Sequence, residues 1–191
     1  MKSVLNLPSG YQEIFKINMK EDRKVMLRIS LLSLLLFVIP MVGAVFFAPL
    51  SALFEGTFIS ILIKWVAIIV GMIVYIIIHE LVHGIFMKIF SRTKVRYGFK
   101  GIYAYAGSSA YYSKRAYIII ALAPVVILGA ILALMNCVVP ISWFWVVYFI
   151  QCYNISGSAG DIYVSCKMGR MQRNILIHDI GDIMTVYTSI N

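Results

Sequence analysis

The sequence predicts an all-α membrane protein with about four transmembrane helices and a small β-hairpin between the second and the third. Of its 191 residues, 61% are hydrophobic and 13% are charged, whereas about a quarter of the residues of an average soluble domain are charged. Four apolar runs have the length that crosses a hydrocarbon core about 30 Å thick. We therefore expect a cytoplasmic lead (1–28), a four-span domain (29–166) and a cytoplasmic tail (167–191).

The four expected spans differ in their surroundings. The first follows a lead that is too long and too mixed in charge for a cleavable signal, so we interpret it as an uncleaved anchor. The second continues as a helix past its apolar part, up to the Ser91-Arg92-Thr93 break. The fourth contains glycines that favour close helix packing or local unwinding. The apolar runs are 29–47, 58–78, 116–135 and 141–166.

Three segments outside the spans have their own patterns. Residues 14–26 form an amphipathic stretch that we expect on the membrane surface. Residues 94–112 alternate aromatic with small or charged residues around glycines, which is typical of a β-hairpin. These aromatic residues also suit a membrane interface. The last 25 residues are polar and predict a solvated tail.

The positive charges predict the orientation. The net charge is +9, and six of the 17 Lys and Arg residues lie in residues 1–28, seven between spans two and three, and three after span four. The loops at 48–57 and 136–140 contain none. The positive-inside rule therefore places both termini and the middle loop in the cytoplasm of a multi-pass cell-membrane protein. Because the lipid bilayer explains the basicity, we expect no nucleic-acid partner.

The chemistry is concentrated in His79-Glu80-Leu81-Val82-His83, an H-E-x-x-H pattern. On a helix this spacing puts two imidazoles on one face, where they can bind one metal ion, with the glutamate beside them as general base. Ionisable residues in a membrane segment usually have a function. We expect His79 and His83 to bind one zinc ion per chain and Glu80 to be catalytic. The alternative is three polar residues solvated at a helix end.

A catalytic zinc usually has a third protein ligand. A metzincin would carry a histidine six residues after His83, where this chain has Ile89, and a gluzincin would use a later glutamate, but none follows Glu80. Asp161 is the only other acid in the last three spans. Counted from their outer ends, both His79 and Asp161 lie roughly 30 Å deep at about 1.5 Å per residue. Asp161 is therefore the leading third ligand.

Two alternatives concern the fourth span. Asp161 could instead pair with Lys167 at the helix end. Asn154 precedes Asp161 by seven residues and shares its helical face. Asn154 is either a catalytic residue that positions the scissile carbonyl or a hydrogen-bonding contact between helices.

These residues resemble the site-2 protease clan of intramembrane zinc peptidases and, within it, the small putative zincin membrane peptidases of Gram-positive bacteria. The resemblance covers residues 71–167 and rests on the H-E-x-x-H motif, Ala123-Pro124 and the stretch from Asn154 to Asp161. It implies that two histidines and an aspartate bind zinc, that the glutamate activates water, and that a hairpin edge strand presents extended substrate. Gly157 stands where the clan usually has proline.

The predicted function is an integral-membrane zinc metalloendopeptidase that hydrolyses a membrane-bound or membrane-proximal peptide or protein. The alternative is a non-catalytic scaffold or regulator with a structural zinc, although such a site has no need of Glu80. A transporter is disfavoured, because four spans without repeat symmetry provide a poor pathway. His178, Asp179 and Asp182 form either a second metal site or part of a solvated tail.

Overall fold

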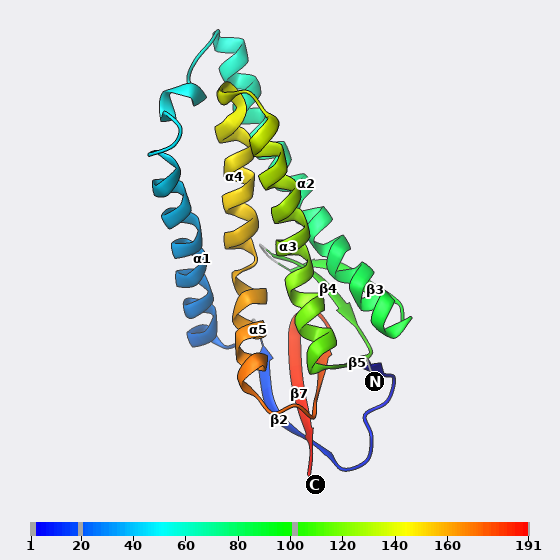
Figure 1. Cartoon of the computed structure of the whole chain (residues 1–191). Helices are drawn as coiled ribbons and strands as arrows, with labels where there is room; N and C mark the ends of the chain where they lie inside the picture. Colours follow the sequence, from blue (N-terminus) through cyan, green and yellow to red (C-terminus); the bar gives the residue numbers. More distant parts are fainter. Residues whose placement is uncertain (1–2, 19–20, 101–102, 191) are drawn as a thin grey trace. The chain divides into compact units, whose positions relative to one another are not determined.

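The computed structural model describes residues 3–18, 21–100 and 103–190. The described part of the chain is mostly helical (63%) and also contains a small sheet. Its helices are α1 (Arg23–Ala44), the 3-10 helix η1 (Leu50–Leu53), α2 (Phe58–Ser91), α3 (Lys114–Val138), α4 (Ile141–Gly157) and α5 (Ala159–Arg170) (Figure 1). Its strands are β1 (Ser3–Val4), β2 (Tyr11–Asn18), β3 (Val95–Lys100), β4 (Tyr103–Ser108), β5 (Tyr111–Ser113), β6 (Ile175–Asp179) and β7 (Ile183–Ser189).

The elements divide into two compact units. The sheet unit consists of residues 1–29, 80–124 and 160–191, and the helical unit consists of residues 30–79 and 125–159. Helices α1, α2 and α3 each contribute one end to each unit. The predicted division into lead, four-span domain and tail stays a prediction about membrane topology.

The helical unit has its own apolar core, formed mainly by Ala44, Ala48, Ala52, Leu53, Ile68, Trp145 and Val146. The indole N–H of Trp145 donates to the carbonyl of Pro49 at 2.9 Å. The buried ammonium of Lys64 donates to the carbonyls of Ala52 and Glu55 at 2.8 and 3.0 Å. These bonds satisfy backbone groups of the connection between α1 and α2, which lies outside regular helix.

Three helices are long and apolar enough to cross a membrane: α1, α2 and α3, with mean hydropathies of 2.4, 2.8 and 3.0. Many of their apolar side chains are exposed in the isolated chain, as a lipid-facing surface requires. The fourth predicted span is divided at Ser158 into α4, of 17 residues, and α5. The orientation of the spans stays a prediction.

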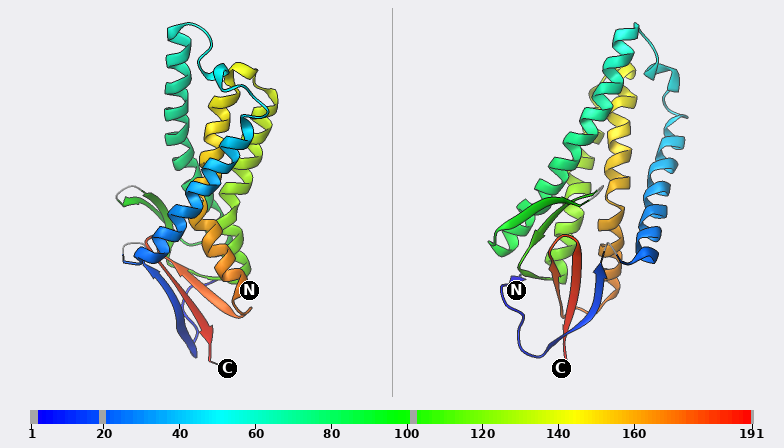
Figure 2. Two further views of the ribbon diagram at one scale, coloured as in Figure 1. Left: turned by 90° about the vertical axis from the view of Figure 1, so that its left-hand side faces the viewer. Right: turned by 180° about the vertical axis from the view of Figure 1, so that it is seen from behind.

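The sheet unit contains a five-stranded sheet with the order β1-β5-β6-β7-β2. Strands β2 and β7, from opposite ends of the chain, pair antiparallel from Tyr11↔Ser189 to Asn18↔Ile183 (Figure 2). This sheet corrects three expectations. The fold is not all-α, the expected amphipathic stretch at 14–26 is divided between β2 and α1, and the tail is not a solvated segment. The short apolar runs of the tail, in β6 and β7, are buried in a core that they share with residues of α3 and α5.

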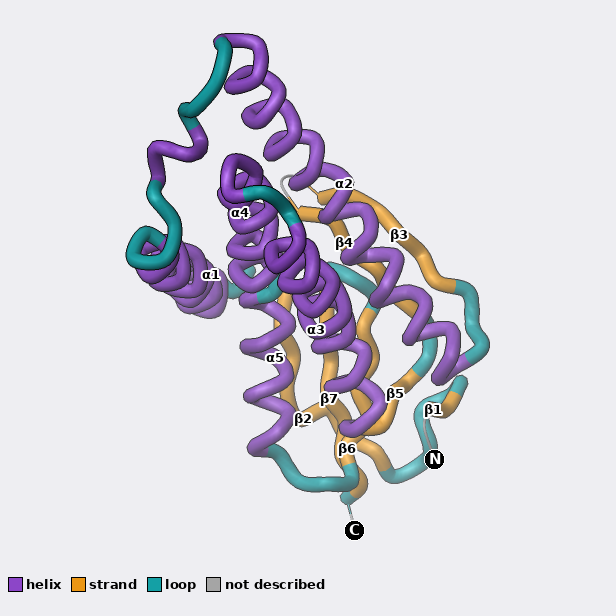
Figure 3. Tube along the Cα trace, turned by 45° about the horizontal axis from the view of Figure 1, so that its top comes forward, coloured by secondary structure: helices purple, strands orange, loops and turns teal. Residues whose placement is uncertain are grey.

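Helices α3 and α5 lie over the strands of this unit (Figure 3). From α3, the residues Ala116, Tyr117, Ile120 and Ala121 enter the core, and from α5, Val164 and Met168 do so. They pack with residues of β6 and β7, including Ile175, Ile177 and Val186. The sheet therefore supports the two helix segments that carry Ile120 and Asp161.

The predicted hairpin is confirmed as β3 and β4, which pair antiparallel from Val95↔Ser108 to Lys100↔Tyr103. Its connecting residues, 101–102, lie outside the described residues. Tyr111 and Tyr112, which we expected at the end of the hairpin, belong to β5 and pair with β1 and β6. In the described chain β3 and β4 have no further strand partner.

Candidate metal centre

The H-E-x-x-H motif lies within α2, which is helical from Phe58 to Ser91. Ligand atoms of His79, Glu80 and His83 lie within 4.8 Å of one another. Among the described residues this is the one group of three or more such side chains close enough to share an ion. Both histidines are buried, with 7% and 8% of their surface exposed. The helix alone produces this clustering, because residues four apart lie on one face.

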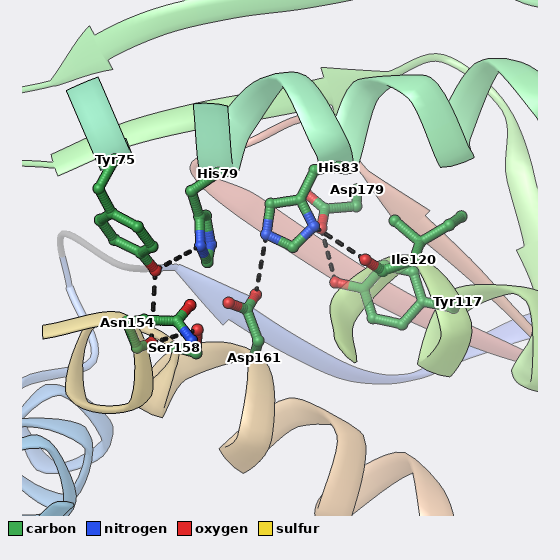
Figure 4. Close-up of polar contacts among 9 residues, drawn as sticks. All are labelled: Tyr75, His79, His83, Tyr117, Ile120, Asn154, Ser158, Asp161 and Asp179. Atoms are coloured by element: carbon green, nitrogen blue, oxygen red, sulfur yellow. Dashed lines mark hydrogen bonds and ion pairs between the residues drawn. The ribbon is translucent and has the colours of Figure 1, made fainter. Parts of the chain in front are cut away.

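His83 is oriented by a backbone carbonyl of α3. Its Nδ1 lies 2.9 Å from the carbonyl oxygen of Ile120 (Figure 4). A carbonyl only accepts hydrogen bonds, so Nδ1 carries the hydrogen and, in the neutral ring, Nε2 carries the lone pair. That carbonyl is accessible because Pro124, four residues later, has no N–H to bond it within the helix. The Ala123-Pro124 pair thereby acquires a structural role.

The Nε2 atom of His83 lies 3.4 Å from Oδ1 of Asp161. A nitrogen lone pair and a carboxylate oxygen repel each other unless a proton or a cation lies between them. Two ligand atoms of one metal ion also point toward each other across the ion. Zinc is commonly bound by imidazole nitrogen and carboxylate oxygen atoms. The residues present therefore fit the zinc that the motif implies.

His79 is oriented from within the helical unit. Its Nδ1 lies 2.7 Å from the hydroxyl of Tyr75, and that hydroxyl donates to the backbone carbonyl of Asn154 at 3.3 Å (Figure 4). When the single hydrogen of this hydroxyl is donated to the Asn154 carbonyl, the hydroxyl oxygen accepts the hydrogen of His79 Nδ1. The Nε2 atom of His79 then carries the lone pair, as a metal ligand requires.

Asp161 lies in the first turn of α5, three residues after the break at Ser158. The hydroxyl and the N–H of Ser158 both donate to the carbonyl of Asn154, at 2.8 and 3.3 Å, and these bonds end α4. The first turn of a helix favours a carboxylate. Lys167, which we considered as an alternative partner of Asp161, lies with its ammonium 3.6 Å from the centroid of the Phe15 ring.

Asn154 is completely buried, and its Nδ2 donates to the carbonyl of Val125 on α3 at 3.2 Å. This bond is the contact between helices that we considered as one of its two roles. Its backbone carbonyl has a further role, because it accepts from Tyr75 and Ser158. Asn154 thus contributes to the orientation of His79 through its main chain.

Sequence reasoning missed the partners of both histidines, Tyr75 and the carbonyl of Ile120. It also missed the contact between Gly84 and Tyr97 in the sheet unit. A Cβ atom at Gly84 would lie 1.9 Å from the Tyr97 hydroxyl oxygen, so a larger residue there would displace the ring from this position. Burial, followed by the negative charge of Glu80, raises the pKa of Tyr97. Gly84, immediately after the motif, is the sequence feature that could have indicated this contact.

The polar cluster near the C-terminus has structural partners. The ring of His178 stacks on Tyr111 with centroids 4.6 Å apart, and burial lowers the pKa of His178. Asp179 accepts from the Tyr117 hydroxyl at 2.6 Å and from the N–H of Gly181 at 2.8 Å. Burial raises the pKa of Asp179. Within the described residues this cluster does not meet the spacing of a metal group.

Comparisons with known proteins bear on the same region. Residues 72–176 match the family DUF3267, described as putative zincin peptidase. No curated protein and no solved structure matches the chain. The match covers more than half of the chain and includes the motif, the Pro124 segment and Asp161. The chain therefore belongs to the putative zincin peptidase family.

Proposed function

We propose that this protein is an integral-membrane zinc metallopeptidase, related to the site-2 proteases, that hydrolyses a peptide bond of a membrane-bound or membrane-proximal substrate. Family membership supports metallopeptidase chemistry. The observation that carries the proposal is the orientation of the two histidines, whose Nδ1 atoms are both bound to outer partners. Both Nε2 atoms are thereby prepared as metal ligands.

In this proposal His79, His83 and Asp161 hold one zinc ion per chain. Zinc, when bound, lowers the pKa of a bound water towards neutrality and polarises the substrate carbonyl. The Glu80 carboxylate accepts the proton of the attacking water and then delivers it to the nitrogen of the leaving amine. Asn154 keeps α4 against α3 and, in the catalytic role proposed for it, positions the scissile carbonyl.

The substrate must be extended at the scissile bond, because a helical peptide group is already hydrogen bonded and is shielded by its own helix. Strands β3 and β4 pair only with each other in the described chain. An extended peptide can therefore add as a third strand to this hairpin. Tyr97 lies on β3 and over Gly84, one residue beyond the second histidine of the motif.

Zinc analysis of detergent-purified protein tests the ligand set. We expect one zinc per chain in wild type and in Glu80→Gln, and loss of zinc in His79→Ala and Asp161→Ala. The conservative Glu80→Gln variant is the matched control, because it removes the base without removing a proposed ligand. Retained zinc in Asp161→Ala would eliminate the third ligand.

Proteolysis needs a separate measurement. Membranes from cells producing wild type or Glu80→Gln are labelled at free protein N-termini and compared by mass spectrometry. New N-termini that depend on Glu80 support the peptidase. Identical N-termini in the two samples, with zinc bound in both, would instead support the non-catalytic scaffold.

A further inference from the structure

The sheet unit contains a basic cavity apart from the motif on α2. Its volume is about 610 Å³, and it lies between the start of α3, the connection from α5 to β6, strand β6 and the segment around β1. Ligand sites in proteins commonly have volumes of about 300–1,000 Å³. The cavity is therefore large enough for a small molecule or a lipid headgroup.

Three cationic residues line this cavity: Lys114, Arg115 and Arg173. None of the residues that line it is acidic. The ammonium of Lys114 donates to the carbonyls of Gly169 and Met171, at 2.8 and 2.6 Å. These bonds tie the start of α3 to the connection that carries Arg173, so the segments bearing the two arginines are held together.

The two arginines are exposed, and in the described part of the chain neither forms an ion pair with a carboxylate. Guanidinium groups bind phosphate oxygens through two parallel hydrogen bonds, with a geometry that lysine lacks. Because no carboxylate of the described chain pairs with these two arginines, both can bind the phosphate group of a ligand.

The remaining walls combine apolar residues, among them Ile118, Ile175 and Leu176, with polar ones such as Ser113 and Asn174. Ile118 lies one turn into α3, whose apolar run is a candidate membrane span. The cavity thus has cations at the end of a span and apolar side chains beside it. This combination suits an amphiphile, with phosphate on the arginines and the apolar part along the helix.

We propose that this cavity binds the phosphate group of an anionic phospholipid, in contact with Arg115 and Arg173. A free phosphate compound shares the chemistry of recognition, and the experiment separates the two sources. The proposal is independent of zinc and of proteolysis, because no residue of the H-E-x-x-H motif lines the cavity.

The test is native mass spectrometry of detergent-purified protein incubated with equal amounts of phosphatidylglycerol and phosphatidylcholine. We expect wild type to retain phosphatidylglycerol preferentially. The double variant Arg115→Gln/Arg173→Gln should lose this preference by about tenfold, because two charge-assisted contacts are removed. The matched control is Arg96→Gln/Arg170→Gln, which removes the same charge from exposed residues that do not line the cavity, and it should behave as wild type.

Two results of this comparison would decide against the proposal. Preference retained in Arg115→Gln/Arg173→Gln would overturn the site, and equal loss in both double variants would show a diffuse charge effect. A second arm adds millimolar inorganic phosphate. Displacement of phosphatidylglycerol by phosphate alone would reassign the cavity to a soluble phosphate compound, whereas undisturbed lipid supports the phospholipid. Thermal unfolding without lipid, unchanged between variants, verifies that both are folded.

Discussion

Replacing Tyr75 by phenylalanine should weaken zinc binding without removing any proposed ligand. The hydroxyl of Tyr75 accepts from His79 Nδ1 at 2.7 Å and donates to the Asn154 carbonyl at 3.3 Å. Tyr75→Phe keeps the ring but removes the partner that keeps the hydrogen on Nδ1. The imidazole then loses the interaction that selects the metal-binding tautomer.

The size of the effect follows from the environment of these bonds. Tyr75 and His79 are 6% and 7% exposed, so water replaces the lost hydroxyl poorly. Removing one partner of a buried hydrogen bond costs about 1–3 kcal/mol, and 1.4 kcal/mol corresponds to tenfold in a binding constant. The Asn154 carbonyl keeps its bond from Ser158 and adds little to the cost. We therefore expect about tenfold weaker zinc binding, within the range for outer partners of metal ligands.

Competition with a chromophoric zinc chelator in detergent measures this change. The matched control is Tyr153→Phe, because the Tyr153 ring packs edge-on against Tyr75 with centroids 5.4 Å apart and no hydrogen bond of its hydroxyl is recorded in the described chain. That variant should bind zinc as wild type does. Zinc affinity of Tyr75→Phe within twofold of wild type, or an equal loss in both variants, would refute the reasoning.

Two further predictions concern the sheet unit. Gly84→Ala places a Cβ atom 1.9 Å from the Tyr97 hydroxyl oxygen. Because Tyr97 is 48% exposed and its ring can move aside, we expect a loss at or below the lower end of the ~1–3 kcal/mol typical of overpacking. Thermal unfolding should show a slightly lower Tm for Gly84→Ala than for wild type and no such loss when Gly84→Ala is added to Tyr97→Ala, and an equal loss with and without the Tyr97 ring would contradict the contact. Burial raises the pKa of Asp179, so this carboxyl keeps its proton to a higher pH in the folded state than in the unfolded state. The free energy of unfolding therefore falls as the pH rises from about 4 through the raised pKa. Asparagine has one acceptor oxygen where the Asp179 carboxylate accepts two hydrogen bonds, so zinc-free Asp179→Asn starts with a Tm offset at low pH. The Tm of this variant minus that of wild type should nevertheless increase as the pH rises from 4.5 to 7, and a pH-independent difference would show that this carboxyl does not titrate in that window.

The sequence was sufficient for features that depend on local periodicity. The apolar runs identified α1, α2 and α3, because helix length and hydropathy are properties of a continuous segment. The motif placed His79, Glu80 and His83 together for the same reason, since a helix brings residues four apart onto one face. The hairpin of β3 and β4 was also predictable, because its strands are neighbours in the chain.

The five-stranded sheet was not predictable in the same way. Strand β2 pairs with β7 across nearly the whole length of the chain, and β5 pairs with β6. Strands β1 and β5 have only two and three residues, and the run at Ile175–Ile177 lacks the alternation of a half-buried strand. Its identity as a strand depends on partners and on burial under α3 and α5, which no local pattern encodes.

For the candidate site, the sequence alone determined the residue types: two imidazoles and a glutamate at helical spacing, and one later aspartate available as a further ligand. Only the tertiary structure decided which nitrogen of each imidazole is prepared for a metal. That choice depends on the Tyr75 hydroxyl and on the carbonyl of Ile120, which Pro124 leaves accessible. The physical reason is that a tautomer is selected by a hydrogen bond, and the atoms that make this bond to His83 lie on another helix, far away in the sequence.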